Sequence, residues 1–374
     1  MQKQAALLIY IEPTPYVLGL IRQIAECSKA PVEVLFIGAN MSQPWNLSLR
    51  GISASYLPHT TIAAALEIFR KLSAGQYSLL HLAGWAHWTL LLALLLAWYH
   101  RIPVFIESDT QLAIGLPLWK RVFKRLFYPL LFRIPTRVLP GGSRQAAYFR
   151  HYGVQSDRIV KVQMTVDVAD IMRRSNIISE QKARPRLRKE FGFSESQTVF
   201  IYVGRLEPHK GIEIMLDAFD ELSRTHPGAA LLVVGEGPER KRVAAAARVN
   251  ESIHYVGRLD YDHVIRAYNC ADVAVVPSIF EPWGLVVNEA MAVGLPSVAS
   301  DRVGCVDDLV KHGETGVIFS AGSRQRLKDS MQFLVEHSEK RKTMGNQAQQ
   351  LIAGWTLENW ARNTVDAWSR GERA

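Results

Sequence analysis

Two segments of this 374-residue chain carry charged residues in positions where they could hold an anion. The first segment is the loop Gly204–Gly211 (GRLEPHKG), which follows an apolar run and precedes a helical pattern. Arg205 and Lys210 could both point into the mouth of a sheet, where a guanidinium and an ammonium would neutralise a pyrophosphate. Two solvated cations in an ordinary turn are the alternative.

The second segment is Val275–Pro296 (VVPSIFEPWGLVVNEAMAVGLP), in which a buried strand ends at Pro277 and a loop carries Glu281. A helix is predicted to begin near Gly284, which places Glu289 about one and a half turns into it. Free backbone N–H groups and the dipole make a helix N-terminus a natural phosphate site. The two carboxylates could accept hydrogen bonds from sugar or ribose hydroxyls, although a loop Glu and a helix-surface Glu are the alternative.

Other chemistries fit the residues less well. No phosphate-binding motif of the form GxxxxGK[ST] occurs, and Gly235-Glu-Gly237 has Arg240 where a dinucleotide fingerprint needs its third glycine. A nicotinamide enzyme is therefore disfavoured. The three cysteines are too few and too scattered for a disulfide framework or a zinc site, and they fit a cytoplasmic protein.

Short apolar runs alternate with longer helical patterns along the whole chain. Several runs are continuously apolar, as strands covered on both faces should be. This alternation predicts an α/β fold with doubly wound parallel sheets, which bind ligands outside the carboxyl ends of their strands. The predicted strands are Ala6–Ile11, Val32–Ile37, Leu79–Leu82, Val104–Ile106, Arg137–Leu139, Thr198–Val203, Ala230–Val234, Ile253–Val256, Val273–Val276 and Ser297–Ala299, and the clearest helices are Ile212–Thr225 and Leu285–Val293.

The length predicts two domains, at roughly 100–200 residues each. The polar, basic segment Asp170–Arg188 lacks a strand pattern and is expected to connect them. We therefore expect a first domain at 1–180 and a second at 181–354. The apolar stretch Ser78–Tyr99 is interrupted and too short to span a bilayer, so we expect a strand, a loop and a buried helix there.

The excess of positive charge lies in the first half of the chain. Residues 1–180 hold 19 Lys and Arg against 10 Asp and Glu, whereas the remaining residues hold 25 of each. Within Trp119–Leu130, apolar residues follow helical spacing and the cations Lys120, Arg121, Lys124 and Arg125 occupy another face. Such a helix can lie on an anionic membrane surface, although a core-facing helix with a solvated basic face is the alternative. No nucleic-acid motif is present, so we expect no nucleic-acid partner.

Together, the loop GRLEPHKG and the segment FEPWGLVVNEAMA, with its Glu281-x7-Glu289 spacing, resemble glycosyltransferase family 4. The resemblance is strong over about residues 190–320 and weak before 135. Further text that fits the family includes Gly257–Leu259, Tyr268–Val273, Gly294–Ser300, Glu314–Phe319 and, in the first half, Tyr152–Val154 followed by Val166 and Asp167.

The resemblance implies a GT-B architecture of two facing Rossmann-like domains, with a last helix in 355–374 that crosses back to the first. It implies a retaining enzyme that needs no metal and no cofactor and takes a nucleotide-diphosphate sugar as donor. Arg205 and Lys210 would grip the diphosphate, Glu281 would orient the sugar, and these three would be catalytic. The implied donor-binding residues are Gly204, Arg205, Lys210, Val256, Arg258, Glu281, Trp283, Gly284, Leu285 and the ribose ligand Glu289.

The first half departs from the family pattern. Many members have a Gly-Gly loop after the first strand, where this chain has Glu12–Tyr16, and a His where it has Glu107-Ser-Asp109. Asp109, Glu107 and His81 are the candidates for the acceptor side. A helix-capping Asp and a satisfied strand-end histidine are the alternatives.

These observations predict transfer of a sugar to a glycan or lipid-linked acceptor, as in the synthesis of bacterial polysaccharide or glycolipid. The enzyme would be cytoplasmic, with peripheral attachment to the inner face of the cell membrane through Trp119–Leu130. The alternative is a non-catalytic GT-B-like protein that binds a membrane or polyanion. The intact set of Arg205, Lys210, Glu281 and Glu289 favours the enzyme.

Overall fold

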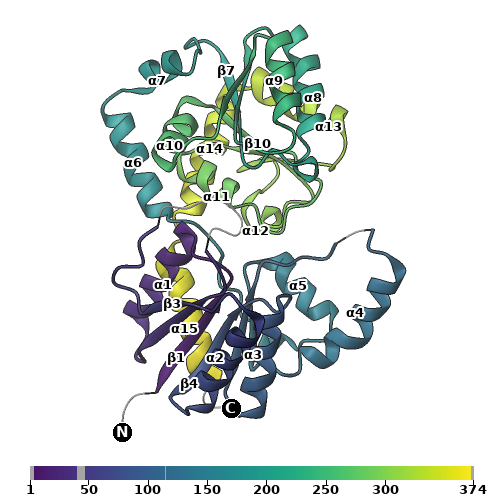
Figure 1. Ribbon diagram of the computed structural model, residues 1–374. Coiled ribbons are helices and arrows are strands. Elements are labelled where there is room, and N and C mark those ends of the chain that lie inside the picture. The colour runs from purple at the N-terminus through teal and green to yellow at the C-terminus, as the bar shows by residue number, and fades with distance from the viewer. Residues whose placement is uncertain (1–3, 40–46, 114, 372–374) are drawn as a thin grey trace. The chain divides into compact units, whose positions relative to one another are not determined.

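The chain forms two compact units, each with its own sheet (Figure 1). The structure is a computed structural model that describes residues 4–39, 47–113 and 115–371. Unit 1 comprises the described residues of Met1–Thr165 and Leu357–Ala374, and unit 2 comprises Val166–Thr356. Within the described residues, each unit has one six-stranded sheet in which all paired strands are parallel.

The sheet of unit 1 has the order β3-β2-β1-β4-β5-β6. The chain runs outward from β1 in one direction and then returns to build β4, β5 and β6 in the other, so the order reverses between β1 and β4. The strands are β1 (Ala5–Tyr10), β2 (Val32–Phe36), β3 (Ala54–Tyr56), β4 (Tyr77–Ala83), β5 (Val104–Ser108) and β6 (Arg137–Pro140). The helices are α1 (Pro15–Cys27), α2 (Thr61–Ser73), α3 (Trp88–Tyr99), α4 (Leu118–Leu131), α5 (Ser143–His151), the 3-10 turn η1 (Ser156–Arg158) and α15 (Leu357–Gly371).

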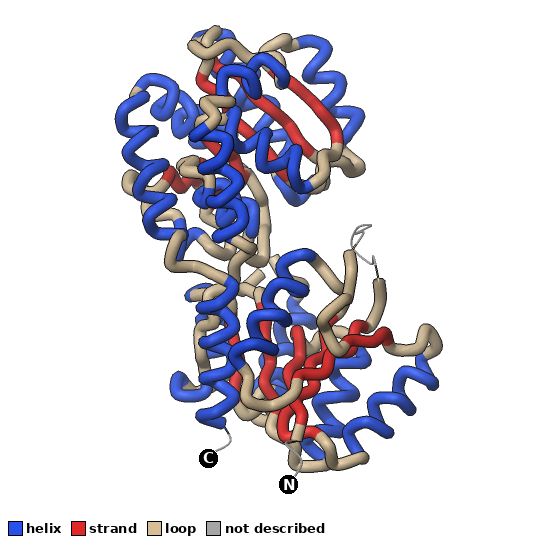
Figure 2. The backbone as a smooth tube through the Cα atoms, turned by 90° about the vertical axis from the view of Figure 1, so that its left-hand side faces the viewer, coloured by secondary structure: helices blue, strands red, loops and turns tan. Residues whose placement is uncertain are grey.

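Unit 2 repeats this plan with the order β12-β11-β10-β7-β8-β9. In both units helices lie against the strands, as the colours of Figure 2 make plain. The strands are β7 (Thr198–Val203), β8 (Ala229–Val234), β9 (Ile253–Gly257), β10 (Val273–Val276), β11 (Ser297–Ser300) and β12 (Gly316–Phe319). The helices are α6 (Val168–Glu180), α7 (Arg184–Glu190), the 3-10 turn η2 (Pro208–Lys210), α8 (Ile212–Thr225), α9 (Arg240–Val249), α10 (Tyr261–Cys270), α11 (Leu285–Ala292), α12 (Val306–Leu309), α13 (Arg324–Glu336) and α14 (Ser338–Ile352).

The prediction of two doubly wound parallel sheets is confirmed, but two edge strands were missed. β3 is three residues long and mostly exposed, so it has no apolar run to detect. β12 is four residues long and begins at Gly316. Short edge strands such as these gain their conformation from the neighbouring strand rather than from their own pattern.

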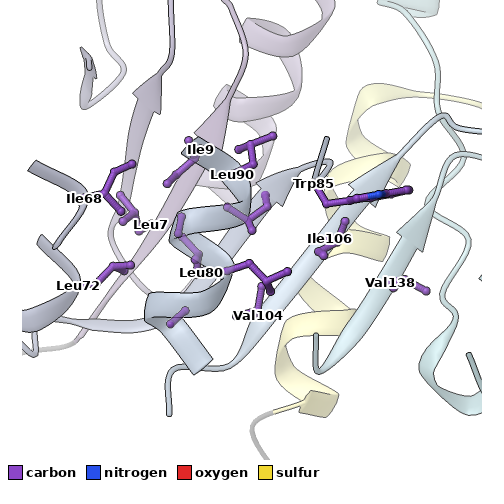
Figure 3. Close-up of a cluster of buried hydrophobic side chains, with 14 of the residues drawn as sticks. Leu7, Ile9, Ile68, Leu72, Leu80, Trp85, Leu90, Val104, Ile106 and Val138 are labelled. Carbon is purple, nitrogen blue, oxygen red and sulfur yellow. The ribbon is translucent and has the colours of Figure 1, made fainter. Parts of the chain in front are cut away.

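The core of unit 1 lies against its central strands (Figure 3). Leu7 and Ile9 of β1 are fully buried, as are Leu80 of β4 and Ile106 of β5, and helix α2 contributes Ile68. Each such side chain stabilises the fold by roughly 1.5–3 kcal/mol relative to an exposed one. This packing fixes one face of the central strands and so positions the residues at their carboxyl ends.

The segment expected to connect the domains is instead helical and belongs to unit 2. Helix α6 buries Val168, Ile171 and Ser175, and the hydroxyl of Ser175 donates to Asn269 Oδ1 on α10 at 2.7 Å. The boundary therefore falls between Thr165 and Val166, not after residue 180. The many charged residues on the outer face of α6 concealed the few buried positions in the sequence.

Helix α15, at the end of the chain, packs in unit 1 against α1. The rings of Tyr16 and Trp360 stack with centroids 6.4 Å apart. A Cβ on Gly19 of α1 would lie 2.6 Å from Leu357 Cδ1, so a larger residue at this position would require the Leu357 side chain to shift. The last helix is thus an integral part of the first unit.

Helix α3 corrects the expectation of a buried helix. Its inner face, with Leu90, Ala93 and Leu94, is buried, but Trp98 is 64% and Tyr99 75% exposed. The helix is apolar on all sides, so its sequence could not show which face is covered. No helix among the described residues combines the length and apolar character needed to cross a membrane.

Candidate functional site

The two predicted anion-binding segments of unit 2 meet at the point where the strand order reverses. β7 lies between β8 and β10, so the loop after β7 and the loop after β10 leave the sheet side by side. The N–H of Ile279 donates to the carbonyl of His209 at 2.8 Å, and a Cβ on Gly211 would lie 2.1 Å from the carbonyl oxygen of Pro277. Crevices at such reversals are where open α/β sheets bind ligands.

Lys210 and Glu281, 71 residues apart in sequence, form an ion pair at this point. Their side chains are only 22% and 14% exposed. Ser278 Oγ lies 3.5 Å from Glu281 Oε2, which is also the oxygen that Lys210 contacts. An ammonium group has three N–H donors, so Lys210 can bind an anion while it keeps contact with Glu281. The pair presents one donor group and one acceptor group to the same small volume.

Arg205 is more exposed, and Glu207 holds its guanidinium. The Arg205 Nη2–Glu207 Oε1 distance is 2.5 Å, and Glu207 Oε2 also lies 3.1 Å from His209 Nδ1. Glu207 was not predicted as part of the site, although a carboxylate between Arg205 and His209 in one loop is a signal that it orients them. A Cβ on Gly235, at the end of β8, would lie 1.8 Å from the Gly204 carbonyl oxygen, so Gly204 and Gly235 allow these two loops to touch.

The N-terminus of α11 completes the group of donors. Gly284, which precedes the helix, has φ 103°, and no side chain caps the first turn. Trp283 is buried and donates its indole N–H to Asn288 Oδ1 at 3.0 Å, which fixes the turn before Leu285. The free N–H groups of this turn suit a negatively charged or hydroxyl oxygen.

Glu289 lies further along α11. The hydroxyl of Tyr268 on α10 donates to Glu289 Oε2 at 2.9 Å. Burial raises the pKa of Glu289 to about 7, and the hydrogen bond from Tyr268 opposes that rise. Val256, which is 36% exposed, lies near the end of β9, and Arg258 directly follows the strand. Tyr268 was noticed only as part of the family pattern, and nothing in the sequence indicates its contact with Glu289.

His81 in unit 1 does not reach a surface. It is fully buried in β4, with Nε2 3.1 Å from Glu107 Oε2 and Nδ1 3.4 Å from the indole N–H of Trp368. Tyr10 donates its hydroxyl to the same Glu107 oxygen at 3.3 Å. Both ring nitrogens therefore have partners, and the structure favours the alternative of a satisfied strand histidine that positions Glu107.

Glu107 and Asp109 line a cavity of about 220 Å³ at the carboxyl ends of β1, β4, β5 and β6. Burial and the nearby Asp109 raise the pKa of Tyr16 to about 12, so its hydroxyl keeps its proton at neutral pH. A cavity of carboxylates and hydroxyls suits a ligand rich in hydroxyl groups. Sequence reasoning did not assign the other five polar residues of the lining, Tyr10, Glu12, Thr14, Tyr16 and Ser108, although Glu12 directly follows the first predicted strand. The lining residues are Tyr10, Ile11, Glu12, Thr14, Tyr16, Val17, Ala83, Glu107, Ser108, Asp109, Gly141 and Met164.

Residues 183–351, which include the whole of the site in unit 2, match the family model "Glycosyl transferases group 1". A glycogen synthase of Mycobacterium tuberculosis is 42% identical over 120 residues, which are 31% of this chain and 29% of the relative. A D-inositol 3-phosphate glycosyltransferase of Corynebacterium efficiens is 32% identical over 207 residues, 53% of this chain and 47% of the relative. The chain therefore spans less than half the length of these two curated relatives.

The fold of the whole chain also has solved counterparts. The Anabaena protein HepE in complex with UDP has a TM-score of 0.80 and 18% identity, over 98% of this chain and all of the other. A complex of the same protein with UDP-glucose has a TM-score of 0.77 and 18% identity, over 98% and 99% of the two chains. The chain thus has the GT-B fold of two Rossmann-like units, and the family resemblance of the motifs is confirmed.

Proposed function

Residues 183–351 belong to the group 1 glycosyltransferases, and on that premise we propose that the chain is a retaining glycosyltransferase with a nucleotide-diphosphate sugar as donor. The observation that carries the proposal is the Lys210–Glu281 pair at the strand-order reversal of unit 2, beside the free N-terminus of α11. Two segments predicted separately from the sequence thus form one site.

The donor would be held by groups of opposite character. Lys210, Arg205 and the N–H groups before Leu285 bind the diphosphate, because all are cationic or hydrogen-bond donors. Glu281 accepts hydrogen bonds from sugar hydroxyls, and Glu289 accepts them from the ribose. HepE, which has the same fold, binds UDP and UDP-glucose.

The chemistry follows from where charge develops. When the sugar–phosphate bond breaks, the sugar gains positive charge and the diphosphate becomes more negative. Cations and backbone N–H groups aimed at the diphosphate therefore stabilise the transition state more than the ground state. The acceptor attacks from the leaving-group face and passes its proton to a donor phosphate oxygen, so no side-chain nucleophile is needed and Glu281 serves for orientation. We propose that no metal and no further cofactor take part.

The acceptor would be a glycan or a lipid-linked sugar in the synthesis of bacterial polysaccharide or glycolipid. The cavity between Glu12, Glu107 and Asp109 would bind its hydroxyl groups. Helix α4, whose side chains are at most partly buried, would attach the cytoplasmic enzyme to the inner face of the cell membrane. The exposed apolar residues of α4, such as Trp119 and Leu126, support this attachment. Tyr128 and Leu131 of the same helix pack against the core of unit 1. The intact donor site argues against a non-catalytic binding protein.

The test is transfer from a panel of nucleotide-sugars, first ranked by thermal stabilisation of the protein and then assayed by the mass of the product. Lys210→Ala and Glu281→Ala should each abolish most transfer and leave the circular dichroism spectrum unchanged. The exposed residues Lys189 and Glu251 provide matched controls, and their alanine variants should keep full activity. Near-normal turnover in both site variants would overturn the assignment, and complete loss of activity in a chelator would overturn the metal-free reaction.

A further inference from the structure

Helix α4 is the centre of a region without acidic residues. No Asp or Glu occurs between Asp109 and Asp157, whereas eight Lys and Arg residues do. Within the described part of the chain, no carboxylate pairs with any of the four cations Lys120, Arg121, Lys124 and Arg125. Because no acidic side chain among the described residues neutralises these four cations, their positive charge is available to an anion from outside.

The two sides of α4 differ in what they present. One side, here called the outer face, consists of the large apolar residues Trp119, Phe123, Leu126, Phe127 and Leu130, which are 49% to 67% exposed. Phe123 and Phe127 stack at 4.5 Å between ring centroids. An apolar row of this size, held away from the core, is typical of a helix that inserts into the boundary of a lipid layer.

The other side of α4 faces a cleft of about 510 Å³ that it shares with α5, beside which it lies in Figure 1. Three cations, here called the cleft cations, line it: Arg121, Lys124 and Arg125. Lys124 Nζ lies 5.4 Å from the ring centre of Tyr128 and 6.0 Å from that of Tyr148. The other lining residues are Leu112, Ala113, Gly115 and Leu116 before α4, Leu118 and Val122 of α4, Tyr148 and His151 of α5, and Tyr152 after it.

The lining of this cleft indicates the chemistry of its ligand. Three cations would bind a phosphate through charge-assisted hydrogen bonds, and guanidinium groups match phosphate oxygens two at a time. Burial, and secondarily the charge of Lys120, lower the pKa of Lys124, so an anion in the cleft would relieve an unfavourable concentration of charge. Leucine, valine and tyrosine beside the cations suit the apolar part of the same ligand.

We propose that the cleft between α4 and α5 binds the phosphate-bearing headgroup of an anionic membrane glycerophospholipid while the outer face of α4 lies among the acyl chains. This inference rests on the proposed attachment to a membrane and adds a defined site to it. The opposite charge of cleft and headgroup, and the position of the apolar row on the same helix, select a phospholipid over a soluble anion.

The experiment compares two doubly substituted variants with the same loss of charge. Arg121→Gln with Arg125→Gln removes two cleft cations, and Lys120→Gln with Arg133→Gln removes two exposed cations that do not line the cleft. Each protein is sedimented with vesicles of phosphatidylcholine, with and without phosphatidic acid. Each is also titrated by calorimetry with a soluble short-chain phosphatidic acid and with inorganic phosphate.

The wild-type protein should sediment only with vesicles that contain phosphatidic acid, and it should bind one soluble phosphatidic acid more tightly than inorganic phosphate. The cleft variant should lose about tenfold or more of the affinity for the soluble lipid, as expected when charged hydrogen bonds are removed. The control variant should keep that affinity. Phe123→Ser with Phe127→Ser should weaken vesicle binding more than binding of the soluble lipid.

If both charge variants lose the same affinity for the soluble lipid, or if the soluble lipid shows no saturable binding, the proposed headgroup site in the cleft is wrong, while membrane attachment stands. Failure of the wild type to sediment would overturn both. Binding of UDP-glucose, measured in the same samples, reports the donor site of unit 2 independently, so failure of the transferase proposal is distinguished from failure of this one.

Discussion

Protonation of Glu289 should weaken the binding of a nucleotide-sugar as the pH falls through 7. Burial raises the pKa of this carboxyl to about 7 in the free protein, and only the ionised form can accept hydrogen bonds from the ribose with both oxygens. About one molecule in eleven is ionised at pH 6 and about ten in eleven at pH 8. The affinity for the nucleotide-sugar scales with the fraction of molecules in which Glu289 is ionised. The Kd should therefore rise about tenfold from pH 8 to pH 6.

The assay is calorimetric titration with UDP-glucose, whose diphosphate does not titrate in this window, at pH 6, 7 and 8. Glu289→Gln is the control, since the amide keeps an acceptor for Tyr268 but cannot ionise. That variant should bind weakly, and its Kd should stay constant over the same range. If the wild type and Glu289→Gln show the same pH dependence, Glu289 does not bind the donor through its charge.

The raised pKa of Glu289 also makes the free energy of unfolding depend on pH. The folded-state pKa of Glu289 lies above the ordinary value of 4.5, so between these values the native protein holds more protons than the unfolded chain. The free energy of unfolding should therefore fall as the pH rises from about 4.5 to about 7. In denaturation experiments the free energy of unfolding of Glu289→Gln should lack this pH dependence. If wild type and Glu289→Gln differ in unfolding free energy by the same amount at pH 5 and at pH 8, the prediction is wrong.

Three further changes test other parts of the structure. Arg188→Met removes a buried guanidinium that donates to four backbone carbonyls and one carboxylate, and calorimetry should show unit 2 destabilised by about 3–5 kcal/mol. Gly284→Ala, at φ 103° and with a Cβ 2.7 Å from a neighbouring methyl group, should cost roughly 1–3 kcal/mol and weaken UDP-glucose binding. Gly313→Ala, at φ 82° in open space, is its control and should leave that binding intact. Trp368→Phe leaves the buried Nδ1 of His81 without its donor and should cost about 1–3 kcal/mol in thermal unfolding of unit 1, whereas an unchanged transition would show that the hydrogen bond contributes nothing.

The donor site could be predicted because its parts are local in sequence. The strand before Gly204 and the strand before Pro277 are continuously apolar, so the loops that follow them had to lie at one edge of a sheet. The contact between Lys210 and Glu281 then follows from the strand order, in which β7 and β10 are neighbours.

The properties that were not predicted depend on contacts between distant residues. The raised pKa of Glu289 needs the surroundings of α10 and α11, and the burial of His81 needs Trp368, 287 residues later. The exposure of α3 and α4 could not be derived from periodicity, because an apolar face looks the same whether protein or another phase covers it. Sequence patterns show where apolar side chains gather, but not what they touch.

The return of α15 to unit 1 affects how the protein is made. The chain leaves unit 1 after Thr165 and re-enters it only at Leu357, once all of unit 2 has been synthesised. At roughly 5–20 residues per second, the intervening segment takes about 10–40 s to translate. During that time α1 lacks Trp360 and His81 lacks Trp368. Unit 1, although its first part is translated before unit 2, therefore reaches its native packing only after all of unit 2 has been synthesised.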